Sequence, residues 1–287
     1  MMLLPDATLQ QSRSFLEIEL RKVYSGGEAA SITRLILEHV GYPYSTLLME
    51  PSLRPGSKIV AQIKEIVADI HTGRPIQYIL GHTYFFDLKI TLTDQVLIPR
   101  PETEEMIHHI IRDHQQAPSR IVDLGTGSGC IALALKKVYP EATVTGADKN
   151  IQALKVAERN SLVNQLPVSW IEWDMLRGLS GELPDGIDLL VSNPPYVRKK
   201  ERRLMQDHVL NFEPGEALFV SDEEPLIFYS AIASLGREHL SKQGIIWVEI
   251  NETLAEETAG VFESAGYHHI HILKDIHDKN RFIRATR

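Results

Sequence analysis

Apolar positions along this chain follow one spacing up to about residue 81 and another from about residue 119. In the first region they recur every three or four residues within three stretches, which predicts amphipathic helices. Glycine and proline separate these stretches and mark the turns between them. Residues 1–81 are therefore expected to form a small helical domain. The three helical stretches are 12–25, 29–40 and 57–71.

Residues 82–98 carry closely spaced aromatic and β-branched side chains on either side of Thr93–Asp94. Two extended runs around a polar pair predict a β-hairpin, here one that joins two domains. A proline-rich segment ends the hairpin, and a helix is expected over 103–112. The boundaries that follow are a hairpin linker over 82–99 and a second domain over 100–287.

From residue 119 short apolar runs alternate with helical stretches. This alternation predicts an α/β domain with a doubly wound, Rossmann-like parallel sheet and helices on both faces. The last two runs are expected to pair antiparallel at one edge of the sheet. The predicted strands are 121–124, 143–147, 168–172, 189–192, 244–250, 268–274 and 281–285.

Composition limits the classes of function. Hydrophobic residues make up 43% of the chain and charged residues 24%, which is typical of a globular protein. The net charge of -8 argues against stable nucleic-acid binding through a basic face. The single cysteine, Cys130, excludes an internal disulfide and a cysteine-rich metal site. With neither a signal segment nor an apolar run of membrane length, a cytoplasmic enzyme away from membranes is expected.

A glycine-rich loop follows the first strand of the alternating region, and its residues are Asp123, Leu124, Gly125, Thr126, Gly127, Ser128 and Gly129. The three glycines permit a tight turn and a close approach of the backbone to a ligand. Asp148 ends the next strand, where a carboxylate can accept from both hydroxyls of a ribose. Ala132 stands in place of the third glycine of the dinucleotide fingerprint. The loop therefore favours S-adenosylmethionine, which needs no pyrophosphate site, over a nicotinamide cofactor.

Three further residues are candidates for the same cofactor site. Asp123 can face a ligand ammonium or the loop amides. Asp174 follows the third strand and can accept from an adenine amino group, while Met175 can pack on the ring. The structural alternative for Asp174 is that it caps a short helix, and the strand, loop and helix together could also be a purely structural turn.

The second motif, Asn193-Pro194-Pro195-Tyr196, leaves the fourth predicted strand. Two prolines cannot continue a central strand, so they set a rigid bend and leave the Pro194 carbonyl free. That carbonyl and the Asn193 side-chain oxygen can accept the two hydrogens of one NH2 group, and Tyr196 offers a flat face. Such a clamp suits methyl transfer to an amide or aromatic amine nitrogen, because it stabilises the positive charge that grows there.

On these residues the chain resembles the HemK/PrmC family of protein-(glutamine-N5) methyltransferases. The resemblance also covers segments 74–81, 98–104 and 275–281. It implies that Gly125 to Gly129 and Asp148 hold S-adenosylmethionine, and Asn193 is a further candidate for this cofactor site. It implies that Asn193, Pro194, Pro195 and Tyr196 bind the glutamine amide in the Gly-Gly-Gln tip of class I peptide-chain release factors, while the helical domain recognises the protein.

The resemblance and placement put Phe85 and Arg100 in the acceptor channel. The protein is expected to be a monomer. No metal is expected, because the histidines over 268–277 show no metal-ligand spacing. The chain departs from the family pattern at two places. Residues 220–224 replace a glycine-rich turn, and Asn251 stands where glycine is common.

Two other classes of function stay open. An adenine-N6 methyltransferase acting on DNA or RNA would use the same clamp on a flipped base, although the acidic balance and the neutral first domain argue against it. The basic cluster over 198–203 could contact phosphate or an acidic protein, or could be a solvated loop. A noncatalytic S-adenosylmethionine-binding module would be favoured by an altered clamp, and this clamp is intact.

Overall fold

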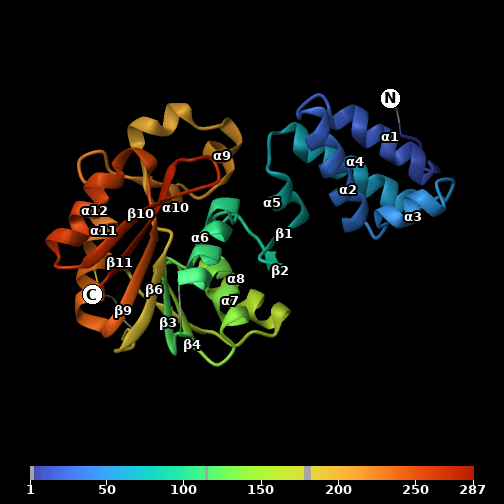
Figure 1. Cartoon of the computed structure of the whole chain (residues 1–287). Coiled ribbons are helices and arrows are strands. Elements are labelled where there is room, and N and C mark those ends of the chain that lie inside the picture. Colours follow the sequence, from blue (N-terminus) through green and yellow to red (C-terminus); the bar gives the residue numbers. More distant parts are fainter. Residues whose placement is uncertain (1–2, 114–115, 178–181) are drawn as a thin grey trace. The chain divides into compact units, whose positions relative to one another are not determined.

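The computed structural model describes residues 3–113, 116–177 and 182–287. The chain divides into two compact units, the first ending at Gly81 and the second beginning at His82. Each unit contains its own cluster of buried apolar side chains. The two units are therefore described separately (Figure 1).

The first unit is helical. Its helices are α1 (Leu9–Leu20), α2 (Gly26–His39), α3 (Tyr44–Met49), α4 (Ser57–His71) and α5 (Ile76–Leu80). Thr8 begins α1 with a capping box, in which its hydroxyl accepts from the Gln11 amide and the Gln11 side chain accepts from the Thr8 amide. The apolar faces of α1, α2 and α4 meet in one core that includes Leu16, Ile36 and Ile63.

The second unit begins with a hairpin of β1 (His82–Phe85) and β2 (Leu88–Thr91). Its turn is formed by Phe86–Asp87, where both φ angles are positive, 50° and 56°. Two-residue hairpin loops need this left-handed geometry to match the twist of their strands. The turn predicted at Thr93–Asp94 is wrong, since that pair lies after β2. A phenylalanine at a positive φ gives no turn signal in the sequence, whereas the polar pair does.

A mixed sheet forms the centre of the second unit, and within the described residues its order is β10-β11-β9-β6-β3-β4-β5. The pairs from β9 to β5 are parallel, while β11 runs antiparallel to both β9 and β10. This confirms the predicted Rossmann-like class and its antiparallel edge. The strands are β3 (Arg120–Leu124), β4 (Thr143–Asp148), β5 (Ser169–Glu172), β6 (Ile187–Ser192), β9 (Leu240–Glu249), β10 (His268–Lys274) and β11 (Asn280–Thr286).

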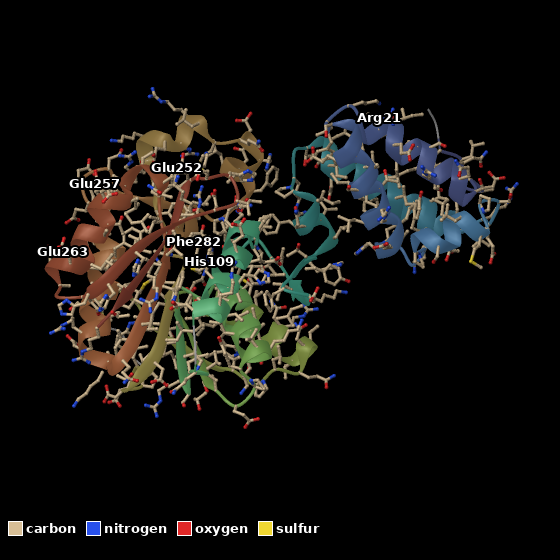
Figure 2. All side chains as sticks on the ribbon, in the orientation of Figure 1. Arg21, His109, Glu252, Glu257, Glu263 and Phe282 are labelled. Atoms are coloured by element: carbon tan, nitrogen blue, oxygen red, sulfur yellow. The ribbon has the colours of Figure 1, made fainter. Side chains whose placement is uncertain are left out.

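Helices cover both faces of the sheet (Figure 1). One face carries α6 (Pro101–Asp113), α7 (Cys130–Val138) and α8 (Ile151–Asn164), and the other carries α11 (Ile227–His239) and α12 (Ala255–Ser264). The central strands are buried on both sides, which explains their continuous apolar runs. On α6, the centroid of the His109 ring lies 5.6 Å from that of the Phe282 ring, and both residues are labelled in Figure 2. The His109 ring also stacks on Trp247.

Between β6 and α11 the chain makes a long excursion of short elements. These are β7 (Val197–Arg198), the 3-10 helix η1 (Lys199–Leu204), α9 (Asp207–Phe212), α10 (Gly215–Leu218) and β8 (Phe219–Val220). Strands β7 and β8 pair with each other in parallel, which folds the excursion back on itself. A second 3-10 helix, η2 (Glu252–Leu254), follows β9.

The strand order reverses between β3 and β6. Strands β4 and β5 extend the sheet from β3 in one direction, while β6 and β9 extend it in the other. In sheets of this kind ligands bind beyond the carboxyl ends of the strands at such a reversal. The two predicted motifs leave these neighbouring ends, where Leu124 of β3 pairs with Ser192 of β6.

Candidate active site

The glycine loop turns sharply between β3 and α7. Gly125, Gly127 and Gly129 have φ angles of 71°, 53° and 81°, a region that residues with a Cβ rarely adopt. A Cβ on Gly129 would also lie 2.8 Å from the Trp170 ring. The loop is attached to β4, because the amides of Gly125 and Thr126 donate to the Ala147 carbonyl at 2.8 and 3.0 Å.

Asp123 lies beneath this loop rather than in the pocket above it. Its side chain is fully buried, and Oδ2 accepts from the Thr126 hydroxyl and, at 3.2 Å, from the Ala132 amide. Burial raises the pKa of Asp123 to about 7. Its Oδ1 has no hydrogen-bond partner among the described residues. Asp123 therefore holds the loop, and its predicted contact with a ligand ammonium depends on that unpartnered oxygen.

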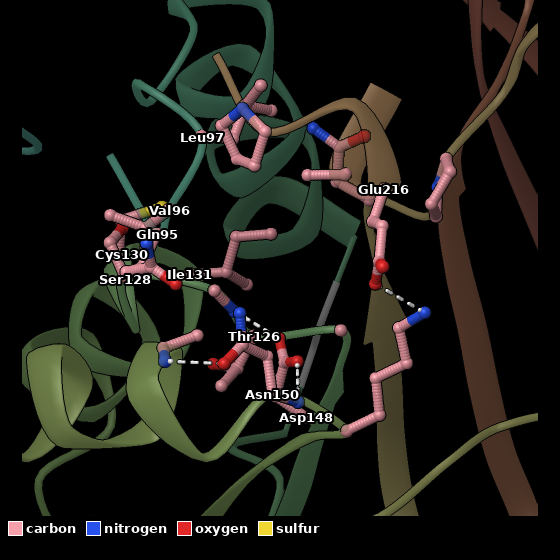
Figure 3. Close-up of a pocket in the computed structure, with 18 of the residues that line it drawn as sticks. Gln95, Val96, Leu97, Thr126, Ser128, Cys130, Ile131, Asp148, Asn150 and Glu216 are labelled. Carbon is pink, nitrogen blue, oxygen red and sulfur yellow. Dashed lines mark hydrogen bonds and ion pairs between the residues drawn. The ribbon is translucent and has the colours of Figure 1, made fainter. Parts of the chain in front are cut away.

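Asp148 stands at the end of β4, beside the loop (Figure 3). Its Oδ2 accepts from the Gly127 amide at 2.9 Å, and its Oδ1 accepts from the Asn150 amide at 2.8 Å. Burial raises the pKa of this carboxyl group as well. Each carboxylate oxygen keeps a second lone pair, so Asp148 can order the loop and still accept from ligand hydroxyls.

A pocket opens over these residues at the carboxyl ends of β3, β4, β5 and β6 (Figure 3). The predicted site residues that line it are Gly125, Thr126, Gly127, Ser128, Asp148, Asp174, Met175, Asn193, Pro195 and Arg100. Gly129 and Asp123 do not line it. Lining residues that were not predicted include Leu97, Pro99, Thr103, Ile131, Lys149, Trp173, Glu216 and Phe228. Pro99, Lys149 and Trp173 adjoin predicted residues in sequence, whereas Glu216 and Phe228 reach the pocket only through the fold.

Asp174 and Met175 form the β5 side of the pocket. Asp174 Oδ1 accepts from the Leu176 amide at 2.8 Å. The described residues after Asp174 form a turn over 175–177, and residues 178–181 lie outside the described part of the chain. The structural alternative, a cap on a short helix, stays a prediction. The side-chain methyl of Met175 would lie 3.2 Å from a Cβ on Gly125, so it packs directly against the loop.

The opposite wall of the pocket comes from α10. The Lys149 ammonium lies 2.9 Å from the Glu216 carboxylate, and the dashed line in Figure 3 marks this ion pair. It joins the end of β4 to the excursion that follows β6. Both side chains are largely exposed, so the pair adds little stability and mainly places α10 beside the pocket.

The clamp motif lies between this pocket and a smaller adjoining one. Pro194 and Tyr196 line the smaller pocket, while Asn193 and Arg100 line both. The remaining walls of the smaller pocket are Leu97, Val197, Ala217 and Leu218. An amide-bearing side chain that enters this apolar slot would meet Asn193 at the point where the two pockets join.

Sequence reasoning missed the groups that hold the clamp. Asn193 Nδ2 donates to Thr103 Oγ1 at 3.1 Å and to Glu249 Oε2 at 3.0 Å. The Tyr196 hydroxyl donates to Glu249 Oε1 at 2.9 Å, and the Thr103 hydroxyl donates to Oε2 at 2.7 Å. Burial raises the pKa of Glu249 and that of Tyr196. The signal that could have pointed to Glu249 is its position at the end of β9, the strand that pairs in parallel with β6.

Phe85 is buried and lines neither pocket, so the structure places it apart from the clamp. Burial raises the pKa of Cys130 to about 12, which keeps its thiol protonated and agrees with a packing role at the start of α7.

Hydrogen bonds through Asn251 connect the basic cluster over 198–203 to the clamp. Arg198 pairs with Glu201 at 2.7 Å. Asn251, one of the departures from the family pattern, donates to Glu201 Oε2 at 2.9 Å and to the Tyr196 carbonyl at 3.2 Å. In the other departure, over 220–224, Asp222 accepts from the Lys200 amide. The hydrogen bonds of both departures therefore hold η1 beside the clamp.

Neither a metal centre nor a membrane helix is found where the structure describes the chain. Across 3–113, 116–177 and 182–287, no group of three or more histidine, cysteine, aspartate and glutamate side chains is arranged to hold a metal ion. Within the same ranges, every helix is too short or too polar to cross a bilayer.

Known proteins with similar sequences decide the family. The model of the family described as "Methyltransferase small domain" matches residues 103–218. A release factor glutamine methyltransferase of Flavobacterium psychrophilum is 38% identical, over 84% of this chain and 85% of that protein. One from Bacteroides thetaiotaomicron is 34% identical, over 96% of this chain and 98% of that protein. The chain belongs to the release factor glutamine methyltransferase family. This confirms the resemblance inferred from the motifs.

A solved methyltransferase from Pyrococcus furiosus aligns with 80% of this chain and 98% of its own, with a TM-score of 0.52 and 15% identity. At that identity the likeness supports the fold alone. Family membership implies S-adenosylmethionine as the methyl donor. The site fits such a group, because Asp148 offers a carboxylate, Asp123 Oδ1 is an unpartnered buried acceptor, and Ile131 and Met175 are apolar.

Proposed function

We propose that this protein transfers a methyl group from S-adenosylmethionine to the side-chain N5 of the glutamine in the Gly-Gly-Gln motif of class I peptide-chain release factors. The observation that carries the proposal is the hydrogen bonding of the Asn193 side-chain amide. Both hydrogens of its Nδ2 are occupied, by Thr103 and Glu249, so Oδ1 is the part of this side chain left to accept from a substrate. Asn193 borders both the glycine-loop pocket and the smaller slot.

The residues of the glycine-loop pocket would hold the donor. S-adenosylmethionine, when bound, supplies an electrophilic methyl group on a sulfonium. Asp148 accepts from ribose hydroxyls, and Asp174 accepts from the adenine amino group. Ile131 and Met175 supply apolar contacts.

The residues of the smaller slot act on the acceptor. Asn193 Oδ1 and the Pro194 carbonyl accept the two hydrogens of the glutamine NH2, which fixes the nitrogen for attack. They also stabilise the positive charge that develops on this nitrogen. An amide nitrogen is a poor nucleophile because its lone pair is delocalised, so both effects are needed. Transfer would form the nitrogen–methyl bond and break the sulfur–methyl bond, which leaves S-adenosylhomocysteine. The excess proton would then pass from the nitrogen to water, so no strong base is required before transfer.

Glutamine N5 methylation of release factors accounts both for the family to which the chain belongs and for the hydrogen-bond acceptors of the clamp. Adenine-N6 methylation would use the same clamp, but the net charge of -8 disfavours a nucleic-acid substrate. The proposed place of action is the cytoplasm. Action as a monomer without a metal stays a prediction.

The experiment incubates the purified protein with labelled S-adenosylmethionine and either a class I release factor or unmethylated duplex DNA. Mass spectrometry then locates the methyl group. Label on the Gly-Gly-Gln glutamine supports the proposal, and a release factor with alanine at that glutamine is the matched control. Label on adenine would keep the donor and clamp but overturn the acceptor. Label on neither, with S-adenosylmethionine bound in calorimetry, would overturn the whole proposal.

A further inference from the structure

The Glu249 carboxylate is the point where the polar side chains of the clamp converge. It ends β9 and is almost fully buried. Its Oε2 accepts from Thr103 and Asn193, and its Oε1 accepts from the Tyr196 hydroxyl. One carboxylate thus receives hydrogen bonds from α6 and from both ends of the clamp motif.

The direction of these hydrogen bonds determines which way the Asn193 amide points. The hydrogen bonds that Thr103 and Tyr196 donate to Glu249 favour its ionised form against the effect of burial. An ionised carboxylate can only accept, so the nitrogen and not the oxygen of the amide must face Glu249. The Thr103 hydroxyl donates its only hydrogen to Glu249, so toward Asn193 it too can only accept. Both neighbours therefore select Nδ2, and Oδ1 is turned away from them.

We propose that Glu249 is a positioning residue for methyl transfer, which with Thr103 holds the Asn193 amide so that Oδ1 faces the acceptor nitrogen. This inference rests on the proposed amide methylation. If the Asn193 amide were turned over, its NH2 group would face the substrate NH2 group, and two donors would meet. The clamp would then lose an acceptor and would repel the positive charge that grows on the nitrogen.

Hydrogen bonds stabilise the buried Glu249 carboxylate. Burying a carboxylate costs free energy unless it is paired and hydrogen-bonded. Among the ion pairs formed within the described residues, none includes Glu249, and Arg281 acts on it only through the longer-range field. An apolar residue here would leave the Thr103 hydroxyl, the Tyr196 hydroxyl and one Asn193 N–H without this acceptor. The acceptor-only chemistry of the acid is what the clamp uses.

Glu249→Gln is the sharpest test, because glutamine keeps the size of the side chain but not its acceptor-only character. Its amide can present oxygen or nitrogen to Asn193, so both orientations of the Asn193 amide become populated. We expect kcat for release-factor methylation to fall by about tenfold or more, since an aligned acceptor contributes on the order of 10²-fold or more. The dissociation constant for S-adenosylmethionine should stay within about twofold, because Glu249 does not line the donor pocket.

A double-mutant cycle separates positioning from folding. If Glu249 acts through Asn193, Glu249→Gln should cost less than about twofold in an Asn193→Ala background, because coupled residues are not additive. Equal fold-losses in both backgrounds would overturn the proposal, and so would wild-type kcat for Glu249→Gln. Thr103 gives a second arm. Thr103→Val removes the hydroxyl that accepts from Asn193 and should lower kcat. Thr103→Ser keeps this hydroxyl and should have a kcat near that of wild type.

Tyr229→Phe is the matched control. The Tyr229 hydroxyl donates to the backbone carbonyl of Glu249 at 3.1 Å, so this variant disturbs the same residue without touching its carboxylate. Its kcat should stay near wild type even if its unfolding midpoint drops. A loss in Tyr229→Phe equal to that in Glu249→Gln would assign the effect to packing and overturn the proposal.

The same series distinguishes this proposal from failure of the proposed function. If wild-type protein does not methylate the release factor, the function has failed. NMR of the Asn193 side-chain NH2 then still tests the geometry. Slow hydrogen exchange of both Nδ2 protons in wild type, and fast exchange in Glu249→Gln, would support the fixed orientation. Fast exchange in both would overturn it.

Discussion

The Arg100 guanidinium lies 2.7 Å from the Glu213 carboxylate, although 113 residues separate them in the chain. The other oxygen of Glu213 accepts from the Ile98 amide. The Glu213 side chain is 1% exposed and that of Arg100 is 30% exposed. This contact joins the segment after the hairpin, which lines the donor pocket and the acceptor slot, to the turn before α10, where Pro214 lines the donor pocket.

Substituting Arg100 and substituting Glu213 should lower the free energy of unfolding by different amounts. Arg100→Ala leaves the buried Glu213 carboxylate without a cation and should lower the free energy of unfolding by about 3 kcal/mol. Glu213→Gln leaves a partly solvated guanidinium and an amide that still accepts from Ile98, so the loss should be about 1 kcal/mol. Urea denaturation of both variants measures the difference. Equal small losses would show that the pair does not stabilise this side of the site.

Asn193→Ala should lower turnover strongly without affecting donor binding. The variant removes the side-chain acceptor of the clamp, and loss of one such group typically lowers kcat by about 10²- to 10³-fold. Methylation of the release factor with labelled S-adenosylmethionine measures turnover, and calorimetry measures the dissociation constant. Turnover near wild type would refute the clamp.

Asp148→Ala should mainly weaken the donor. The variant loses the hydrogen bonds that the ribose hydroxyls would donate to the Asp148 carboxylate, and it loses the contact with the Gly127 amide. The dissociation constant for S-adenosylmethionine should therefore rise by about 10- to 100-fold. Calorimetry measures this constant directly. Lys155→Ala, at an exposed position on the following helix, is the control and should bind like wild type. An unchanged constant for Asp148→Ala would remove the predicted ribose role.

The buried Asp123 carboxyl group should make stability depend on pH. Burial raises its pKa from 3.8 to about 7, so between these values the folded chain keeps a proton that the unfolded chain has released. The free energy of unfolding therefore falls as pH rises through this window and levels off above it. Asp123→Asn cannot titrate and should gain on the order of 4 kcal/mol relative to wild type between about pH 4 and about pH 8.

Urea denaturation of both proteins at the two pH values measures this shift. The isosteric amide keeps an oxygen for Thr126 and Ala132, so the comparison isolates the proton from the loop contacts. A stability difference that stays constant with pH would show that Asp123 is ionised throughout.

Local pattern was enough to predict the elements with strong periodicity. Helix α4 matches its predicted range, and the strands of the sheet lie within a few residues of theirs, because buried strands must be apolar on both faces. The hairpin turn was misplaced, since Phe86–Asp87 adopts positive φ angles that its residue types do not signal. The short helices α3 and α5 were not predicted, because five or six residues are too few to show a period.

The sequence alone determined the chemistry of this protein: a glycine loop after one strand, an acid after the next, and an Asn-Pro-Pro-Tyr motif after a third. Each is a local pattern, and parallel strands bring their carboxyl ends to one edge. Only the tertiary structure decided that Asp123 supports the loop from below, that Arg100 meets Glu213, and that Glu249 holds Asn193. Arg100 and Glu213 are 113 residues apart, and Asn193 and Glu249 are 56 residues apart, so the geometry of these two contacts exists only once the sheet and its helices have packed.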